Sequence, residues 1–250
     1  MKKLFLSLIA AASLCTTGAT MAADLVVSAA ASLTNAFTDI GKEYEKAMPG
    51  TRVLFNFAGS GQLLQQLSRG APVDVFASAD QETMDKAVKQ NLIVRGTRRD
   101  FVSNKLVVIV PVNSQLDLKA LDGLKAAEVK RIAVSNPESV PVGRYSKQAL
   151  AVAGLWDTLK DKYISTTNVR QSLDYTARGE VDAGFVYVTD ALLMPNRVKI
   201  SFEQPLATAI LYPIAVVKGN GNENSARAFL AFLNQEPAQK ILQKYGFGKP

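Results

Sequence analysis

The sequence predicts an α/β protein built from two units, each a mostly parallel sheet flanked by helices. Short apolar runs alternate with amphipathic segments of helical period throughout the chain. The first series ends near residue 104, and a second begins with the strongly apolar stretch 106–110. At 250 residues, with 48% hydrophobic and 20% charged residues, the chain is long enough for two modest domains.

The first unit is predicted to contain three strand–helix pairs. The strands are expected at 25–28, 52–57 and 73–77, and the helices at 33–48, 62–68 and 81–90. Pro49-Gly50 follows the first helix and Arg69-Gly70 follows the second. Proline cannot continue a helix and glycine is favoured just past its end, so both helices should stop there.

The second unit repeats this alternation. Its strands are expected at 106–110, 131–135, 162–165 and 181–188, and its helices at 121–127, 144–153 and 169–178, with a short helix from Thr189. A strand at 212–217 and a helical region at 225–245 complete the chain. No linker-like composition separates the units near residue 104, so the C-terminal helices are expected to pack back on the first unit.

The composition excludes several kinds of active site. The chain has no histidine, and its one cysteine, Cys15, lies in the leader described next. A Ser-His-Asp or Cys-His nucleophilic site, a His or Cys zinc site and a disulfide are therefore ruled out. An enzyme would have to use carboxylates, Lys, Tyr or a bound cofactor, and no cofactor is predicted.

Residues 1–23 are predicted to form a secretory signal peptide. Lys2 and Lys3 precede the apolar run 4–15, and small residues favour cleavage near Ala22 or Ala23. A lipoprotein signal at Cys15 is disfavoured by the bulky residue before it. No later segment is apolar enough to span a membrane, so a periplasmic protein is expected. Removal of Lys2 and Lys3 with the signal peptide lowers the formal net charge from +7 to +5. The remaining basic residues are scattered, so no nucleic acid partner is expected.

The stretch 25–35 carries the first candidate binding site. An apolar strand runs through three alanines into a helical pattern, with Ser32 at or near the helix N-terminus. Such an end presents unpaired N–H groups and a partial positive charge, and a hydroxyl adds another donor. This arrangement binds anions without a charged side chain. The alternative is that Ser32 or Thr34 only caps its own helix.

Further junctions resemble the first. Ser60 stands between two glycines after a strand, and the N–H groups of Val142 and Val169 lie at expected helix starts. Tyr187 lies near the carboxyl end of a strand, where open α/β sheets bind ligands. An ordinary turn, plain helix starts and a core tyrosine are the alternatives. Together, the junctions indicate a cleft for a small oxyanion between two units.

The motifs resemble those of one family. Ala29-Ala-Ala-Ser-Leu-Thr-Asn-Ala36 resembles the opening motif of periplasmic molybdate-binding proteins, the solute receptors of molybdate ABC transporters. Further matches follow in order over the mature chain: Asp74-Val-Phe-Ala-Ser-Ala-Asp80, Asn136-Pro-Glu-Ser-Val-Pro-Val-Gly143, Val169-Arg170, Gly184-Phe-Val-Tyr187 and Tyr245-Gly-Phe247.

The resemblance implies a type II periplasmic binding protein fold with a ligand cleft at a hinge. The first lobe would comprise 24–104 and 213–250, and the second 105–212. It also implies a receptor that binds molybdate or tungstate and delivers it to a membrane permease. Nothing in the sequence indicates more than a monomer. Carried over by motif, the oxyanion ligands are Ser32, Ser60, Val142, Val169 and Tyr187. Glycines around Ser60, and Val142 in place of a smaller residue, depart from the family pattern and put the pocket dimensions in doubt.

Charged residues next to these positions leave alternatives open. The family pattern places Arg144 and Arg170 outside the direct ligand contacts, although either could face the anion. A cleft with donors only should reject phosphate, which carries an O–H, unless Asp80 or Asp190 accepts that proton. A sulfate receptor and a carboxylate-based enzyme remain as rival functions. A transcriptional sensor is opposed by the leader and the lack of a DNA-binding segment.

Overall fold

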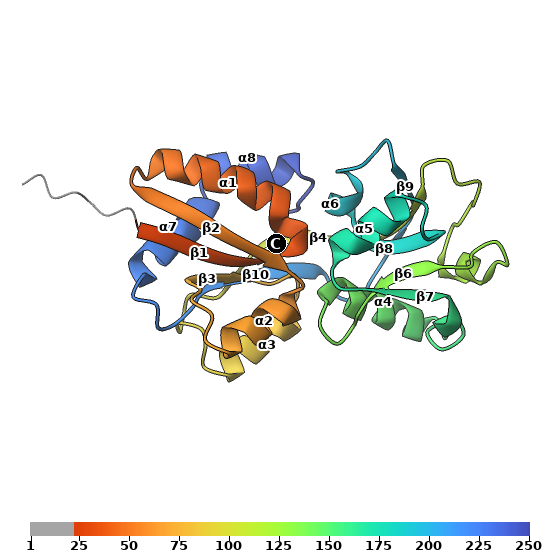
Figure 1. Cartoon of the computed structure of the whole chain (residues 1–250), viewed down its shortest axis with the longest axis horizontal. Coiled ribbons are helices and arrows are strands. Elements are labelled where there is room, and N and C mark those ends of the chain that lie inside the picture. The colour runs from red at the N-terminus through yellow and green to blue at the C-terminus, as the bar shows by residue number, and fades with distance from the viewer. Residues whose placement is uncertain (1–22) are drawn as a thin grey trace, which may run out of the picture.

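The computed structural model describes residues 23–250, which form two lobes side by side (Figure 1). Each lobe has a five-stranded sheet flanked by helices, which confirms the predicted fold class. The predicted signal peptide and its cleavage site fall outside the described residues, apart from Ala23. Within 23–250, no helix combines the length and apolar character needed to cross a membrane.

Lobe 1 is the part of the chain built on the sheet β2-β1-β3-β10-β4. Its strands are β1 (Ala23–Ala30), β2 (Thr51–Ala58), β3 (Val75–Ala77), β4 (Arg99–Asn104) and β10 (Ile210–Val216). Its helices are α1 (Thr34–Ala47), α2 (Ser60–Ser68), α3 (Gln81–Lys89), α7 (Glu223–Leu233) and α8 (Glu236–Lys244), and a 3-10 turn, η1 (Ala31–Leu33), precedes α1.

Lobe 2 is built on the sheet β7-β6-β8-β5-β9. Its strands are β5 (Leu106–Pro111), β6 (Ile132–Ser135), β7 (Tyr163–Thr166), β8 (Ala183–Tyr187) and β9 (Val198–Gln204). Its helices are α4 (Pro141–Val152), α5 (Val169–Ala177) and α6 (Val188–Ala191). Two 3-10 segments, η2 (Leu121–Lys125) and η3 (Lys160–Lys162), complete it, and η2 stands where the sequence predicts a short helix at 121–127.

The two sheets share one pattern of strand directions. In lobe 1, β1 pairs in parallel with β2 and β3, whereas β10 runs antiparallel to β3 and β4. In lobe 2, β6 pairs in parallel with β7 and β8, whereas β5 runs antiparallel to β8 and β9. The expectation of mostly parallel sheets therefore holds for half of the pairings, because β5 and β10 enter their sheets directly from the other lobe.

The chain crosses between the lobes at β4–β5 and between β9 and β10. The first crossing is tight, since only Lys105 separates β4 from β5. The C-terminal helices return to lobe 1, where Tyr44 of α1 packs edge-on against Phe229 of α7 with ring centroids 5.1 Å apart. The helical region predicted at 225–245 is broken into α7 and α8, and Pro237 lies in the first turn of α8, where its missing N–H costs least.

Candidate functional site

A small, partly open cavity lies between the lobes, with roughly 200 Å³ of empty space. Lobe 1 contributes residues at or after the ends of β1, β2 and β3, and lobe 2 contributes residues at or after the ends of β6, β7 and β8. This placement agrees with the tendency of α/β sheets to bind ligands beyond the carboxyl ends of their strands. The lining residues are Ala30, Ala31, Ser32, Ala58, Gly59, Ser60, Ala79, Val140, Pro141, Val142, Asn168, Val169 and Tyr187. All five residues that the sequence singles out are therefore brought together around one cavity.

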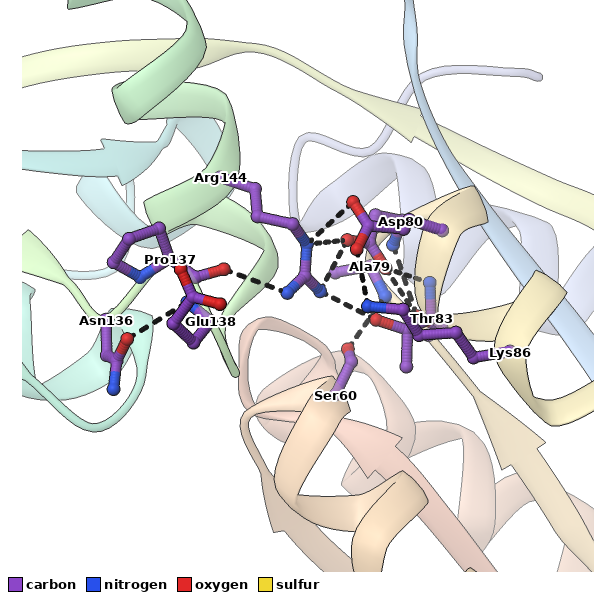
Figure 2. Close-up of polar contacts among 11 residues, drawn as sticks. Ser60, Ala79, Asp80, Thr83, Lys86, Asn136, Pro137, Glu138 and Arg144 are labelled. Atoms are coloured by element: carbon purple, nitrogen blue, oxygen red, sulfur yellow. Dashed lines mark hydrogen bonds and ion pairs between the residues drawn. The ribbon is translucent and has the colours of Figure 1, made fainter.

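Lobe 1 presents two buried serine hydroxyls to this cavity. Ser32 lies in η1, which runs directly into α1, and Ser60 is the first residue of α2. The Ser32 Oγ is 3.0 Å from the hydroxyl of Tyr212. The Ser60 Oγ accepts a hydrogen bond of 3.1 Å from the backbone N–H of Ala79 (Figure 2). Because an accepted bond leaves the serine proton free, Ser60 can donate into the cavity.

Lobe 2 presents the N-termini of two helices. Asn168 caps α5, and its side-chain oxygen accepts from the N–H groups of Arg170 and Gln171, at 2.9 and 3.1 Å. The N–H of Val169, the first residue of the helix, has no acceptor within the helix. Val142 lies in the first turn of α4, directly after Pro141, so its N–H is another donor that the helix itself does not satisfy.

Close backbone packing positions the start of α4. A Cβ added to Gly143 would lie 2.1 Å from the carbonyl oxygen of Ser135 at the end of β6. Only glycine permits this approach, which brings the first turn of α4 against the carboxyl end of the strand. The glycine of the Pro-Val-Gly stretch, which marks this site in the sequence, is thus required by the close packing inside lobe 2.

Tyr187 ends β8 and carries an orphan hydroxyl. Its side chain is 1% exposed, and its Oη has no hydrogen-bond partner in the described part of the chain. Burial raises the pKa of the Tyr187 phenol well above its ordinary value, so the group stays protonated. A buried hydroxyl without a partner is costly. Because Tyr187 also lines the cavity, this hydroxyl is a candidate donor at the site.

Among residues 23–250, no charged side chain lines the cavity. The two carboxylates that raise doubt about selectivity, Asp80 and Asp190, are both held by arginines. Asp80 caps α3 by accepting from the N–H of Thr83 at 3.1 Å, and its other oxygen lies 2.6 Å from Arg144 Nη2. Asp190 is fully buried, with Oδ1 2.6 Å from Arg170 Nε.

Arg144 spans the two lobes (Figure 2). It extends from α4 and donates within lobe 2 to the carbonyl of Pro137 at 3.0 Å. It donates across the interface to Asp80 Oδ2 at 2.7 Å and to Thr83 Oγ1 at 2.7 Å. The guanidinium is therefore used in joining the lobes, and it does not line the cavity.

Arg170 makes a second bridge between the lobes. Its Nη1 donates to Asn35 Oδ1 at 2.8 Å, and its Nη2 donates to the carbonyl of Ser32 at 3.1 Å. Its Nε is paired with Asp190 within lobe 2. Both arginines thus follow a donor amide by one or two residues and cross to lobe 1, a role that the sequence alone does not reveal.

Two buried residues near the crossing also contact this network, and the sequence gives no sign of them. Tyr212 of β10 is the partner of Ser32, and Asn104 at the end of β4 donates to the Tyr212 hydroxyl at 3.2 Å. Tyr212 lies in an apolar strand that reads as ordinary core, and Asn104 ends β4, which the sequence does not predict as a strand. The Ser32–Tyr212 pair is separated by 180 residues in the chain.

This fold, with a neutral donor-lined cavity between two lobes, defines a class of two-lobed binding proteins. The chain belongs to the family of bacterial extracellular solute-binding proteins, which it matches over residues 25–248.

Individual relatives are similar over nearly the whole chain. The molybdate-binding protein ModA of Escherichia coli K12 is 38% identical, covering 89% of this chain and 88% of the relative. ModA of Haemophilus influenzae is 35% identical, covering 90% of each. Among solved structures, the periplasmic molybdate-binding protein of Azotobacter vinelandii superposes with a TM-score of 0.80 at 26% identity, covering 90% of this chain and 99% of that protein.

Proposed function

We propose that this protein is an exported receptor that binds molybdate, and also tungstate, between its lobes and delivers it to the permease of an ABC transporter. The observation that carries the proposal is the orphan hydroxyl of Tyr187, which faces a cavity surrounded by neutral donors from both lobes. The names of the relatives support molybdate as the ligand. The proposed ligands are the hydroxyls and amides of Ser32 and Ser60, the amides of Val142 and Val169, and the hydroxyl of Tyr187.

A dianion in this cavity would lose its hydration, which formally costs tens of kcal/mol in a dry site. Aligned hydrogen bonds to a charged group offset this cost, each by about 1.5–3 kcal/mol net. The dipoles of the helices that begin at the cavity add to them. Because the donors come from both lobes, the anion favours the closed arrangement by population shift, and a permease would recognise that closed shape.

The donor set also supports selectivity against protonated oxyanions. Hydrogen phosphate carries an O–H that needs an acceptor, and both nearby carboxylates are paired with arginines. An unpaired proton in a buried site lowers affinity strongly. Sulfate has no such proton, so its rejection would rest on its smaller size.

Several further features belong to the same proposal. The mature protein would begin near Ala22 or Ala23, act as a monomer in the periplasm and catalyse no reaction. Its first lobe would comprise 24–104 with 213–250, and its second 105–212. The absence of Asp, Glu, Lys, His and Cys from the cavity lining supports a binding role over a carboxylate-based enzyme.

The test is calorimetric titration of the mature protein with molybdate, tungstate, sulfate and phosphate in a buffer free of these anions. Tight one-to-one binding of molybdate and tungstate, with sulfate and phosphate far weaker, is expected. Ser32→Ala and Ser60→Ala should each weaken binding while the fold survives. Tight sulfate binding would move the assignment to a sulfate receptor, and no heat from any oxyanion would overturn the proposal.

A further inference from the structure

The hydroxyl of Ser32 can act toward a ligand either as a donor or as an acceptor, and its buried partner decides which. The Ser32 side chain is 3% exposed, and its Oγ lies 3.0 Å from the Tyr212 hydroxyl. If Tyr212 donates to Ser32, the serine proton is free for the cavity. If Ser32 donates to Tyr212, the serine presents only lone pairs.

The backbone at the lobe crossing fixes this direction through Asn104. The N–H of Lys105 donates to Asn104 Oδ1 at 2.9 Å, which identifies that atom as the amide oxygen. The amide nitrogen therefore faces the other way, where it donates to Thr189 Oγ1 at 2.9 Å and to the Tyr212 hydroxyl at 3.2 Å. The Tyr212 oxygen is thus an acceptor toward Asn104.

The Tyr212 hydroxyl then has one acceptor available for its proton, the Ser32 Oγ. Tyr212 is 0% exposed, and within residues 23–250 its hydroxyl has two hydrogen-bond partners, Asn104 and Ser32. Asn104 is a donor, so a satisfied Tyr212 must donate to Ser32, since a buried O–H without an acceptor is costly. These hydrogen bonds form a relay through Asn104 and Tyr212. It runs in one direction, from the backbone N–H of Lys105 to the hydroxyl of Ser32.

We propose that Asn104 and Tyr212 are positioning residues for ligand specificity, which hold Ser32 as a donor toward the cavity so that an oxyanion with its own O–H finds no acceptor there. The inference rests on the proposed function, since it takes the ligand to be a tetrahedral oxyanion. The N–H of Ala79 sets the same polarity at Ser60, so both serines donate. Residues that do not contact the ligand thus make both serine hydroxyls donors toward the cavity.

Asn104→Asp should reverse the relay. A carboxylate still accepts from the Lys105 N–H, but toward Tyr212 it can only accept. The Tyr212 proton would turn to position 104, Ser32 would donate to Tyr212, and Ser32 would offer a lone pair to the cavity. Asn104→Ala and Tyr212→Phe remove the relay without reversing it and without adding charge.

Sulfate and hydrogen phosphate separate this effect from charge and size. They are similar tetrahedral dianions that differ by one O–H, so an added negative charge weakens both. The readout is the ratio of the phosphate Kd to the sulfate Kd, obtained by competition with molybdate at a pH where hydrogen phosphate dominates. A purely structural role for Asn104 or Tyr212 would not change this ratio.

In the wild type, phosphate should bind more weakly than sulfate. The ratio should fall about tenfold or more in Asn104→Asp, as expected for one hydrogen bond to a charged group. It should fall by a smaller factor in Asn104→Ala and Tyr212→Phe. Tyr44→Phe, which removes another buried phenol of lobe 1 remote from Ser32, should leave it unchanged.

A wild-type ratio in both Asn104→Asp and Tyr212→Phe, in proteins that still bind molybdate, would overturn the inference. So would equal affinity of the wild type for phosphate and sulfate. Should Asn104→Asp fail to fold, Tyr212→Phe, which keeps the ring, decides alone. A wild type that binds no oxyanion overturns the proposed function instead, so the two failures are distinguishable.

Discussion

Replacing Gly61 with alanine should weaken ligand binding without weakening the fold. Gly61 is the second residue of α2, and its φ is not positive, so alanine fits its backbone conformation. A Cβ at this position would nevertheless lie 2.6 Å from the carbonyl oxygen of Ser139. Ser139 belongs to the loop before α4 in lobe 2, so the clash exists only while the lobes are together.

The size of the effect follows from this geometry. Restoring an ordinary contact of 3.4 Å requires the lobes to separate locally by about 0.8 Å. That shift also stretches the hydrogen bond of 2.9 Å from the Gly61 N–H to Ser139, worth about 1 kcal/mol. It further misaligns the donors of one lobe relative to the ligand. A total loss of about 2–4 kcal/mol is expected, which is roughly 30- to 1,000-fold in Kd.

Calorimetry with molybdate measures the loss, and denaturant unfolding of the free protein provides the fold control. The free energy of unfolding should stay the same or rise, by up to about 1 kcal/mol, because alanine favours helix over glycine. Gln65→Ala is the matched substitution, since Gln65 is exposed on the same helix. Wild-type affinity in a folded Gly61→Ala protein would refute the argument that the close contact of the lobes is needed for binding.

Three further predictions test other parts of the site. Tyr187→Phe should weaken molybdate binding about 10- to 150-fold by calorimetry, yet stabilise the free protein by about 1 kcal/mol, because the lost hydroxyl has no partner. Arg144→Ala should raise the dissociation rate in stopped-flow experiments and leave the association rate nearly unchanged, because it removes bonds between the lobes. Burial raises the pKa of Asp190 from 3.8 to about 6, and Arg170 offsets only part of this rise. The folded protein thus gains stability from protonated Asp190 at low pH and loses it as the pH rises from about 4 through about 6, so the stability of the wild type relative to Asp190→Asn should fall by about 2 kcal/mol between pH 4 and 7. Wild-type affinity in Tyr187→Phe or a wild-type dissociation rate in Arg144→Ala would contradict the corresponding argument. So would a stability difference between the wild type and Asp190→Asn that is equal at pH 4 and pH 7.

Local signals were sufficient to predict the strand-to-helix junctions. Small residues after β1, the glycines around Ser60 and the capping residue Asn168 act within a few positions of themselves, so their meaning is independent of the rest of the fold. The same reliance on local signals means that the edge strands β4 and β9 are not predicted. Residues 99–104 begin with two charged residues, and β9 is largely exposed, so neither shows a clean apolar alternation.

The connections between junctions could not be predicted from the sequence. Arg144 and Arg170 stand beside the candidate donors, but their bonds to Asp80 and Asn35 exist only because the two lobes face each other. Tyr212 lies in an apolar strand and Asn104 at the end of an edge strand, and neither position gives a sign of the other as its partner. A pairing between residues 180 positions apart depends on the strand order of both sheets.

The distribution of charge explains how a neutral cavity can serve a receptor that must also release its ligand. A lysine or arginine in the cavity would attract an anion from one lobe alone, with the cleft open or closed. In this protein, two arginines near the cavity are instead committed to Asp80 and Asp190. The proposed donors are dipoles, whose effect depends on alignment, and donors from two lobes align on one anion only when the lobes are together. In the proposed mechanism, separating the lobes is therefore enough to lower the affinity, and a permease needs to supply no competing charge.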